Sequence, residues 1–235
     1  MPDRPTARTI PPRALLLDAY GTLLEVEPPV PALAARLAAA GRRFPDEAVA
    51  RAFAAEVAHY RAHHLRGGDP EGLAALRLEC AGVLAAALGD GAPPAEEVLP
   101  MLVGALRFRP LPDAVPLLDA AARAGLRLGL VSNWDMSLRA VLDDLGWTGR
   151  FGAVCISAER GVAKPDPALF RCALRELGVA PGEALHCGDD PVLDGDGAAA
   201  AGVPAVLVDR TGRGGGDRHA RVRDLTHLVR DLINS

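Results

Sequence analysis

Short apolar runs end in polar side chains at several places along the chain. Continuous apolar runs of this kind indicate strands that are buried on both faces, as in a parallel sheet. Because the ends of such strands gather at one edge of an open sheet, where ligands bind, we expect polar residues that are far apart in sequence to converge there. These residues are Asp18 after the run 14–17, Ser132 after 126–131, Asp189 after 184–187 and a glycine, and Lys164 from a loop bounded by glycine and proline.

Between residues 31 and 104 the pattern changes to helical. Apolar residues recur at spacings of three and four, as at Val49, Phe53, Val57 and Tyr60, which is typical of a helix with one buried face. Turns rich in glycine and proline separate the helical stretches, and no run in this block indicates a strand. The block therefore predicts a small helical bundle inserted after the first strand.

After residue 111 helical and strand patterns alternate. Such alternation implies βαβ units, and therefore a parallel sheet flanked by helices. The sequence predicts strands at 126–131, 151–156, 184–187 and 205–208, and helices at 114–124, 136–145, 167–177, 194–201 and 221–233. We expect an α/β fold with two parts, a core from residues 1–28 and 105–235 and an all-helical domain from residues 29–104.

Charge and composition narrow the class of protein. With a net charge of −4 over 235 residues, the chain has no basic excess to neutralise phosphates, so no nucleic-acid partner is expected. No apolar stretch approaches the ~20 residues of a membrane span, and the polar, proline-rich residues 1–13 do not resemble a secretory signal. The four cysteines form no CxxC pair, which predicts buried free thiols. We expect a cytoplasmic monomer or homodimer that acts on a small molecule and has no membrane partner.

Four polar motifs follow the predicted strands in order. They are Asp-x-x-Gly-Thr from Asp18, Ser132-Asn133, Lys-Pro-Asp-Pro from Lys164, and Gly-Asp-Asp-x-x-x-Asp-x-x-Gly-Ala from Gly188. Together they resemble the motifs of haloacid dehalogenase (HAD) superfamily hydrolases, and the last motif is the most specific in this context. The resemblance covers nearly the whole chain. It implies a Rossmann-like catalytic core with a helical cap domain inserted after the first core strand.

The resemblance implies catalytic roles for these residues. Asp18 matches the family's nucleophile, whose covalent intermediate splits one hard displacement into two easier ones. Thr22 and Ser132 match the hydroxyl donors that hold the transferring group, and Asn133 supports the same loop. Lys164 matches the lysine that balances the charges of nucleophile and substrate, a task that suits a compact ammonium. From the residues alone, turn capping by the acid and the hydroxyls, and an ordinary exposed lysine, remain alternatives.

The resemblance also implies a magnesium site. Asp189 matches the family's metal ligand, Asp194 and Asp190 would help through water, and Asp18 and the backbone carbonyl of Tyr20 would complete the protein ligands. All-oxygen ligands favour Mg²⁺ over zinc, and a divalent cation removes the repulsion between facing carboxylates. The alternative is that Asp189 only solvates a loop while Asp194 caps the following helix.

Tyr20 departs from the commonest pattern of the family. Phosphatases of the family usually carry a second aspartate at this place as general acid and base, and a phenol with a reference pKa near ~10 cannot easily replace it. The Asp-x-Tyr-Gly-Thr form resembles the 2-haloacid dehalogenases, in which a halide leaves without protonation. Those enzymes are metal-free and lack the paired Gly-Asp-Asp. We therefore expect a Mg²⁺-dependent phosphatase, with a 2-haloacid dehalogenase or a catalytically weak or inactive binding protein as alternatives.

The predicted cap carries few residues that separate these alternatives. Phosphonate cleavage would need a cap lysine, and the cap segment contains none. Arg36, Arg42 and Arg43 lie outside any motif that matches the arginine with which the dehalogenases hold a substrate carboxylate. His59 and His63 share a helical face at a spacing that can bind zinc, but no third ligand is evident, so solvated histidines are expected.

Overall fold

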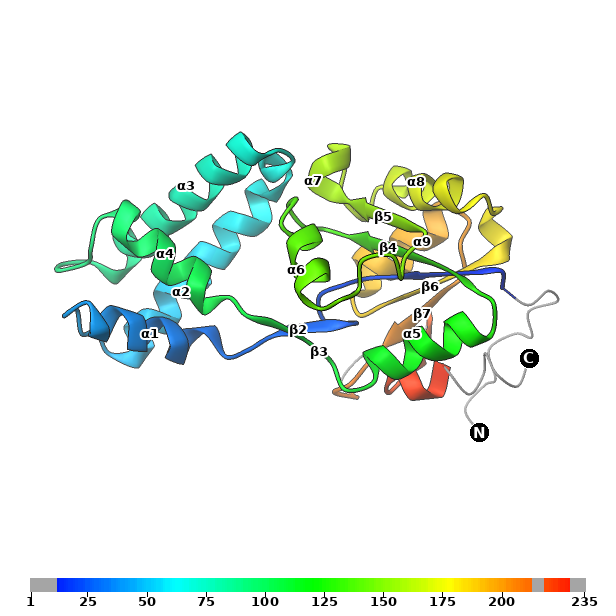
Figure 1. Ribbon diagram of the computed structural model, residues 1–235, viewed down its shortest axis with the longest axis horizontal. Coiled ribbons are helices and arrows are strands. Elements are labelled where there is room, and N and C mark those ends of the chain that lie inside the picture. The colour runs from blue at the N-terminus through cyan, green and yellow to red at the C-terminus, as the bar shows by residue number, and fades with distance from the viewer. Residues whose placement is uncertain (1–11, 213–217, 229–235) are drawn as a thin grey trace.

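A six-stranded parallel sheet forms the centre of the computed structural model, which describes residues 12–212 and 218–228 (Figure 1). The strand order is β5-β4-β1-β6-β7-β8, so β1 lies between β4 and β6. The strands are β1 Ala14–Leu17, β4 Arg127–Ser132, β5 Ala153–Ile156, β6 Ala184–Gly188, β7 Ala205–Val208 and β8 Ala220–Val222. The predicted α/β fold with a parallel sheet is confirmed.

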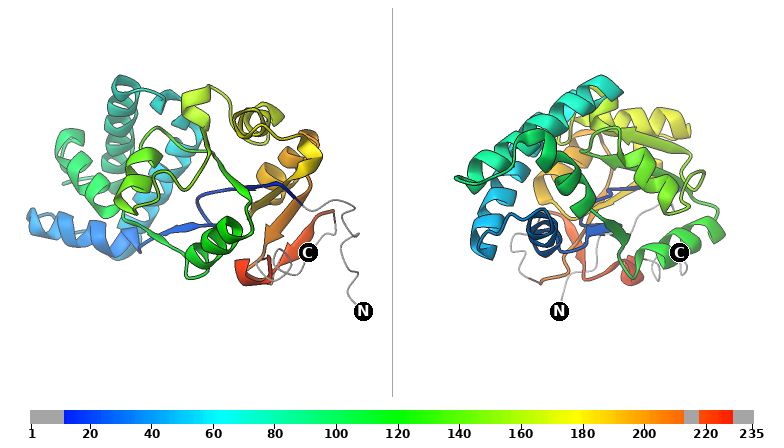
Figure 2. Two further views of the ribbon diagram at one scale, coloured as in Figure 1. Left: turned by 45° about the vertical axis from the view of Figure 1, so that its right-hand side comes forward. Right: turned by 60° about the vertical axis from the view of Figure 1, so that its left-hand side comes forward.

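The central strand β1 is buried on both faces, as its continuous apolar run predicted. Leu15 and Leu17 belong to one apolar cluster, and Ala14 and Leu16 belong to another, because successive side chains of a strand point to opposite faces. Helices cover both faces of the sheet (Figure 2). α5 Ala114–Arg123 and α6 Leu138–Asp144 pack into the first cluster, and α8 Pro167–Leu177 and α9 Gly197–Ala200 pack into the second.

A helical insert after β1 forms a second body beside the sheet, on the left of Figure 1. Its helices are α1 Pro29–Ala39, α2 Asp46–His63, α3 Pro70–Leu88 and α4 Ala95–Ala105, with a 3₁₀ turn, η1 His64–Gly67, after α2. The insert has its own apolar core, in which Leu33, Leu76 and Leu84 are fully buried. This confirms the predicted helical insertion, which we call the cap.

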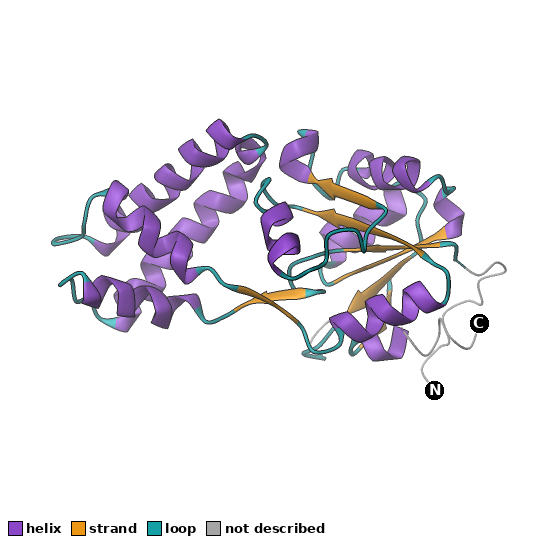
Figure 3. Cartoon of the chain, viewed as in Figure 1, coloured by secondary structure: helices purple, strands orange, loops and turns teal. Residues whose placement is uncertain are grey.

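A short antiparallel ribbon joins the cap to the core. β2 Leu24–Val26 leads into the cap and β3 Phe108–Pro110 leads out of it, and the two strands pair with each other (Figure 3). The sequence analysis missed this ribbon, because three-residue strands are too short to show an alternating pattern. The ribbon makes both chain crossings between cap and core run side by side.

The cap also touches the core at a second place, where α2 ends. Tyr60 Oη donates a hydrogen bond of 2.9 Å to Asp135 Oδ2, and the backbone N–H of Met136 donates to Gly67 O at 2.9 Å. Both core residues follow β4, the strand that ends at Ser132. The end of α2 therefore docks beside the edge of the sheet where the predicted site residues lie.

Two of the predicted helices differ from the structure. The helix predicted for 221–233 is wrong at its start, because Ala220–Val222 forms β8 and pairs with β7; residues 225–228 are helical, and 229–233 lie outside the described residues. The helix predicted for 194–201 is preceded by a π-helical turn, Pro191–Asp196, and only Gly197–Ala200 is α-helical. Short helical turns also occur at α7 Ser157–Arg160 and η2 Pro181–Glu183.

The cysteines are buried free thiols, as the sequence analysis predicted. All four cysteines are buried and free, at Cys80, Cys155, Cys172 and Cys187. In the described part of the chain no helix has both the length and the apolar character needed to cross a membrane. The polar N-terminal segment lies outside the described residues except for its last two.

Candidate active site

The predicted site residues meet at the carboxyl edge of three neighbouring strands. Asp18 follows β1, Ser132 ends β4 and Asp189 follows β6, and these strands are adjacent in the sheet. Lys164 reaches the same edge from the loop between α7 and α8. Its Nζ lies 2.6 Å from Asp18 Oδ1, and Ser132 Oγ lies 3.4 Å from the same oxygen. The topology thus brings four residues, spread over most of the sequence, within reach of one reacting group.

Lys164 is the only lysine in the sequence, and it is buried. Its Nζ donates to Asp18 Oδ1 and to Asp194 Oδ1, each at 2.6 Å. Burial lowers the pKa of Lys164, but the two carboxylates outweigh burial and raise that pKa above its usual range, so the ammonium stays charged. An ordinary exposed lysine, the alternative left open by the sequence, is ruled out.

Asn133 holds the lysine loop in place through both ends of its amide. Asn133 Nδ2 donates to Lys164 O at 2.9 Å, and Asn133 Oδ1 accepts from the backbone N–H of Lys164 at 2.7 Å. This two-way bond ties the end of β4 to the loop before α8. The predicted support role of Asn133 therefore has a structural basis, directed at the lysine backbone.

The carboxyl of Asp18 has an unusual environment for an acid. It is only 5% exposed, and burial raises its pKa to about 6 against the opposing effect of Lys164. The neighbouring carboxylates of Asp194 and Asp189 also raise it. Within residues 12–212 and 218–228, the hydrogen bonds to this carboxylate come from Lys164 and Ser132, so it does not cap the turn that follows β1.

Asp194 is held by four donors. Its Oδ1 accepts from Lys164 Nζ at 2.6 Å and contacts His186 Nε2 at 2.9 Å, while its Oδ2 accepts from the backbone N–H groups of Asp189 and Asp190 at 3.2 and 3.1 Å. Although burial raises the pKa of Asp194, Lys164 and His186 lower it below its usual range. Because a carboxylate offers about four lone-pair sites, this set of contacts favours a positioning role through Lys164 and the loop, and the predicted help of Asp194 to a metal through water stays a prediction.

The helix-capping alternative for Asp194 is wrong. Asp190 caps the following turn instead, since its Oδ1 accepts from the backbone N–H groups of Val192 and Leu193 at 2.8 and 2.9 Å. Asp190 is therefore engaged in capping, and any help to a metal from this residue stays a prediction.

The acid cluster fits a divalent cation. Asp18, Asp189 and Asp194 each place a carboxylate oxygen so that all three lie within 4.8 Å of one another, while Lys164 supplies a single positive charge. Partial burial and the Asp194 carboxylate raise the pKa of Asp189 to about 6. All-oxygen donors with an excess of negative charge suit Mg²⁺.

The backbone after Tyr20 runs directly against the Asp189 carboxylate. A Cβ atom on Gly21 would stand 2.3 Å from Asp189 Oδ2, so a larger residue would displace this carboxylate, and the φ of +89° at Gly21 also favours glycine. The predicted Tyr20 carbonyl ligand belongs to this stretch. When bound, Mg²⁺ would neutralise negative charge between Asp18 and Asp189.

Thr22 contributes a buried hydroxyl without a partner. Its Oγ1 forms no hydrogen bond within the described residues, and its side chain is fully buried. Leaving such a group unsatisfied costs about 1–3 kcal/mol. The turn-capping alternative for Thr22 is therefore wrong, and a substrate oxygen would supply the missing partner.

A family model described as haloacid dehalogenase-like hydrolase matches residues 12–202. This stretch contains all four motifs, the cap and the acid cluster described above. The chain belongs to the haloacid dehalogenase-like hydrolase family.

Two curated relatives in this family are phosphatases by name. The phosphoserine phosphatase of Thermus thermophilus is 48% identical over 105 residues, which cover 44% of this chain and 42% of that protein. The glyceraldehyde 3-phosphate phosphatase of Methanopyrus kandleri is 38% identical over 109 residues, which cover 44% of this chain and 45% of that protein. The matched stretch thus spans less than half the length of either relative.

Solved structures of HAD-like proteins share the whole fold. The L-2-haloacid dehalogenase from Xanthobacter autotrophicus is 23% identical, with a TM-score of 0.67, and the match covers 95% of this chain and 99% of that one. The HAD-hydrolase YfnB from Bacillus subtilis, bound to magnesium, is 17% identical, with a TM-score of 0.71, and the match covers 95% of this chain and 100% of that one. At these identities the likeness shows the fold alone.

Tyr20, which stands where HAD phosphatases usually carry the acid, is half exposed at the edge of the site. Its side chain is 45% exposed and lies edge-on to Trp134, with ring centroids 6.4 Å apart. No hydrogen bond of the described residues joins its phenol to Asp18, Lys164 or Asp189. The phenol therefore contributes no proton donor to the cluster itself.

The cap histidines form no metal site. His59 and His63 stack with ring centroids 4.3 Å apart, the His63 ring bonds to His59 O at 2.8 Å, and His59 Nε2 lies 3.5 Å from Glu79. Neither histidine belongs to a potential metal-binding group within the described residues. The expected solvated histidines are found only in part, because both rings are partly buried and His59 Nε2 has no hydrogen-bond partner among the described residues.

The cap arginines supply no evident carboxylate clamp. Arg36 Nη2 donates to Gly104 O at 2.8 Å, so this side chain ties α1 to α4 inside the cap. Arg42 and Arg43 are exposed beyond the end of α1. Arg36 is therefore engaged within the cap, and among the described residues none of these three arginines bonds to the acid cluster.

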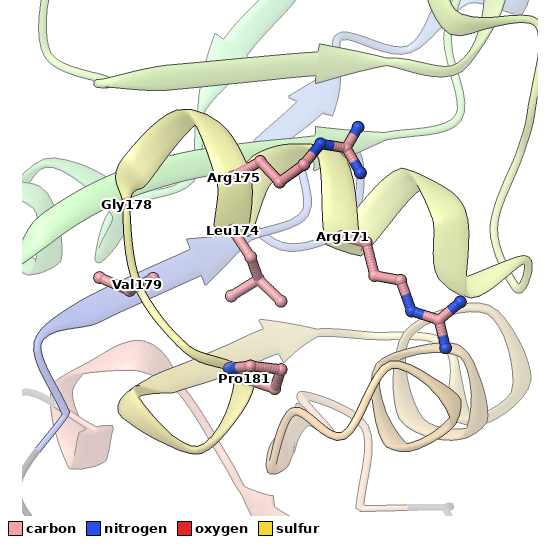
Figure 4. A pocket seen from close by; sticks show the side chains of 6 residues that line it. All are labelled: Arg171, Leu174, Arg175, Gly178, Val179 and Pro181. Carbon is pink, nitrogen blue, oxygen red and sulfur yellow. The ribbon is translucent and has the colours of Figure 1, made fainter.

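A recess of about 440 Å³ lies at the opposite edge of the sheet (Figure 4). It forms where α8 ends and the chain turns toward β6, at the amino ends of the strands. Arg171 and Arg175 flank an apolar floor of Leu174, Val179 and Pro181. Because open α/β sheets bind ligands at the carboxyl ends of their strands, the acid cluster is the better candidate for the substrate site.

Two contacts of the site escaped the sequence analysis. His186 is fully buried within β6, and its Nε2 bonds to Asp194. The sequence did carry a signal for this contact, because a histidine stands inside an otherwise apolar strand, two residues before the Gly-Asp-Asp motif. The bond from Tyr60 to Asp135 had no signal, because it joins residues of the cap and the core that are distant in sequence.

Proposed function

We propose that this protein is a Mg²⁺-dependent phosphatase that acts on a small phosphorylated metabolite through an aspartyl-phosphate on Asp18. The observation that carries the proposal is the grouping of three carboxylates within 4.8 Å of one another, of which two, those of Asp18 and Asp194, pair with the single ammonium of Lys164. This grouping holds more negative charge than Lys164 can balance. A metal-free dehalogenase would have to keep the Asp189 carboxylate beside that of Asp18 without a further cation, although like charges at this separation repel.

In the proposed reaction Asp18 attacks phosphorus. A bond forms between a carboxylate oxygen and phosphorus, the bond from phosphorus to the ester oxygen breaks, and the leaving group departs with the electron pair. Lys164, Ser132 and Thr22 would hold the non-bridging oxygens, and the unpartnered Thr22 hydroxyl would gain a hydrogen bond. Water then attacks the aspartyl-phosphate, which releases phosphate and restores Asp18.

The absence of a carboxylate at position 20 sets the preferred leaving group. A positioned general acid typically contributes about 10²–10⁴-fold, and Tyr20 is exposed and unbonded to the cluster. Acyl and aryl phosphates need little protonation of the leaving oxygen. We therefore propose these classes as the better substrates, and alkyl monoesters as poorer ones.

A substrate panel tests the proposal. The purified full chain would be assayed with p-nitrophenyl phosphate, acetyl phosphate and an alkyl monoester, with Mg²⁺ and with EDTA, beside Asp18→Asn. We expect EDTA-sensitive turnover, faster for aryl and acyl phosphates and lost in Asp18→Asn. Equal rates for alkyl and aryl esters would contradict the leaving-group preference. Identical background rates in wild type and Asp18→Asn would favour a scaffold that binds without turnover.

The second candidate is a 2-haloacid dehalogenase. Tyr20 favours it, and the Xanthobacter autotrophicus enzyme shares the fold. In that reaction Asp18 would attack carbon and a halide would leave. Turnover of 2-chloropropionate that survives EDTA, together with inertness toward phosphate esters, would replace the first proposal with this one. Nucleic acid and membranes have no place in either proposal, and a monomeric or homodimeric state stays a prediction.

A further inference from the structure

A second cluster of metal-ligating side chains lies between the edge strand β5 and α8. Cys155 comes from β5, and Cys172 and Glu176 come from α8, four residues apart on one face of that helix. One ligand atom of each residue lies within 4.8 Å of the other two. The Cys172 thiol also lies 3.5 Å from Glu176 Oε1. None of these residues belongs to the acid cluster around Asp18.

The donor set of this cluster differs in kind from that of the acid cluster. Two thiols and one carboxylate suit Zn²⁺, whereas the all-oxygen set around Asp18 suits Mg²⁺. In tetrahedral zinc sites with Zn–S bonds of about 2.3 Å, two sulfurs stand about 3.8 Å apart. Separations within 4.8 Å therefore require only a small inward movement of the side chains.

The surroundings of the cluster balance the charge of such a site. Two thiolates and one carboxylate carry three negative charges, so a bound Zn²⁺ leaves one. Arg160 pairs with Glu176 and supplies the compensating positive charge. Cys155 is fully buried and Cys172 nearly so, while Glu176 is exposed and gives the ion a path from solvent.

We propose that Cys155, Cys172 and Glu176 bind one Zn²⁺, with water as the fourth ligand. Binding releases the two thiol protons to solvent and leaves the oxidation state of every atom unchanged. Without a metal, burial raises the pKa of Cys155 to well above its usual range, so this thiol is a poor reactant for disulfide exchange.

The proposed ion would brace the frame of the active site. Ile156, next to Cys155, pairs in register with Ser132 of β4, and α8 follows directly on the loop that carries Lys164. A link between β5 and α8 would therefore tie together the neighbours of the two segments that carry Ser132 and Lys164.

Cobalt titration tests this site independently of catalysis. The reduced full chain, saturated with Mg²⁺ to occupy the oxygen site, would be titrated with Co²⁺ and followed by absorption. We expect thiolate-to-cobalt charge-transfer bands and the d–d bands of tetrahedral Co²⁺, saturating at one equivalent and removed by one equivalent of Zn²⁺. The absence of these bands from wild type would overturn the proposal.

Three variants locate the binding residues. Cys172→Ser should lose the charge-transfer bands, and Glu176→Gln should weaken Co²⁺ binding by at least about tenfold, since even groups outside the ligand shell have effects of that size. The matched control is Cys80→Ser, which removes a buried thiol from the cap and should keep the bands. Retention of the bands in a folded Cys172→Ser, or unchanged affinity in Glu176→Gln, would contradict the assignment. The exposed position of Glu176 keeps the test decisive if the cysteine variants fold poorly.

Discussion

At the scale of single residues, the site depends on one ammonium placed among acids. Lys164 is the only lysine of the chain, and arginine supplies every other basic side chain apart from histidine. It bridges Asp18 and Asp194 with two bonds of 2.6 Å in a buried setting. A planar guanidinium could not reproduce a point charge at this distance from two carboxylates without moving them. The lysine therefore has both a structural and a catalytic part in this account.

Replacing Lys164 by methionine should destabilise the fold as well as abolish turnover. The substitution leaves two buried carboxylates without their counter-charge, and breaking a buried pair in this way typically costs about 3–5 kcal/mol. Urea denaturation at neutral pH would measure the loss in the free energy of unfolding. Arg139→Met is the matched control, because Arg139 forms an exposed pair with Glu159 and its removal should cost at most about 1 kcal/mol. Equal costs for the two variants would contradict the bridging role of Lys164.

Glu56 in the cap predicts a pH dependence of stability. The carboxyl is 5% exposed, and burial raises its pKa while a hydrogen bond from Cys80 lowers it only in part. A raised pKa in the folded state means that the contribution to stability is full below the unfolded value, near ~4.3, and is lost as pH rises through the folded value. Glu56→Gln should therefore raise Tm relative to wild type at pH 7.5 and change it little at pH 4.

The pKa of Glu79 is shifted in the opposite direction to that of Glu56. Glu79 therefore serves as the control for the pH dependence of Tm. Its carboxylate pairs with Arg66, which lowers its pKa, so its contribution is present above the unfolded value and is lost on acidification. Glu79→Gln should lower Tm slightly at pH 7.5. A Glu56→Gln variant less stable than wild type at pH 7.5 would show that this carboxyl is not disfavoured by burial.

At the scale of elements, the docking of the cap on the core rests on a close backbone approach. A Cβ atom on Gly68 would stand 2.3 Å from Ala158 O in α7, although the backbone of Gly68 itself is unstrained for other residues. Tyr60 and Gly67 make the neighbouring contacts to Asp135 and Met136. This contact and the β2–β3 ribbon together hold the cap beside the strand ends.

Gly68→Ala should therefore loosen the cap without unfolding it. The added methyl group collides with backbone, which cannot move aside as a flexible side chain would, so the end of α2 must withdraw from α7. Hydrogen exchange should rise relative to wild type at the Met136 amide, which donates to Gly67 O across this contact. Gly82→Ala is the control, since the nearest atom to its added Cβ is 3.9 Å away and alanine favours the α3 helix. Unchanged exchange in Gly68→Ala would mean that the contact does not hold the cap.

The sequence predicted the long and locally patterned elements well and missed those that depend on distant partners. The helix 167–177 and the strand 205–208 were predicted with the bounds that the structure has. By contrast β2, β3 and β8 are three residues each, and β8 takes its strand form from pairing with β7 although the local pattern is helical.

The site residues also divide into those that have a local sequence signal and those whose contacts depend on distant partners. The convergence of Asp18, Ser132, Lys164 and Asp189 on one sheet edge was predicted, because each stands at a strand end or in a turn with its own motif. The four bonds around Asp194, the role of Asp190 as the cap, and the Tyr60–Asp135 contact depend on side-chain positions in three dimensions. No spacing along the chain encodes those positions.

At the scale of the whole molecule, the chain folds into two bodies, the core with its parallel sheet and the helical cap. The parallel sheet brings the acids and the lysine to one edge, and the cap, with its own apolar core, docks at that edge through α2 and the ribbon. The family match over residues 12–202 spans both bodies. In the proposed reaction the chemistry takes place at the strand ends.

A crystal structure of the full chain with Mg²⁺ and beryllium trifluoride, a mimic of the phosphoryl group, would test directly whether Asp18 accepts the phosphoryl group. The account predicts beryllium bonded to an Asp18 carboxylate oxygen, fluorines facing Lys164, Ser132 and Thr22, and Mg²⁺ held between Asp18 and Asp189 at oxygen distances of about 2.0–2.1 Å. Beryllium trifluoride bound to a residue other than Asp18, or Mg²⁺ bound away from Asp189, would contradict it.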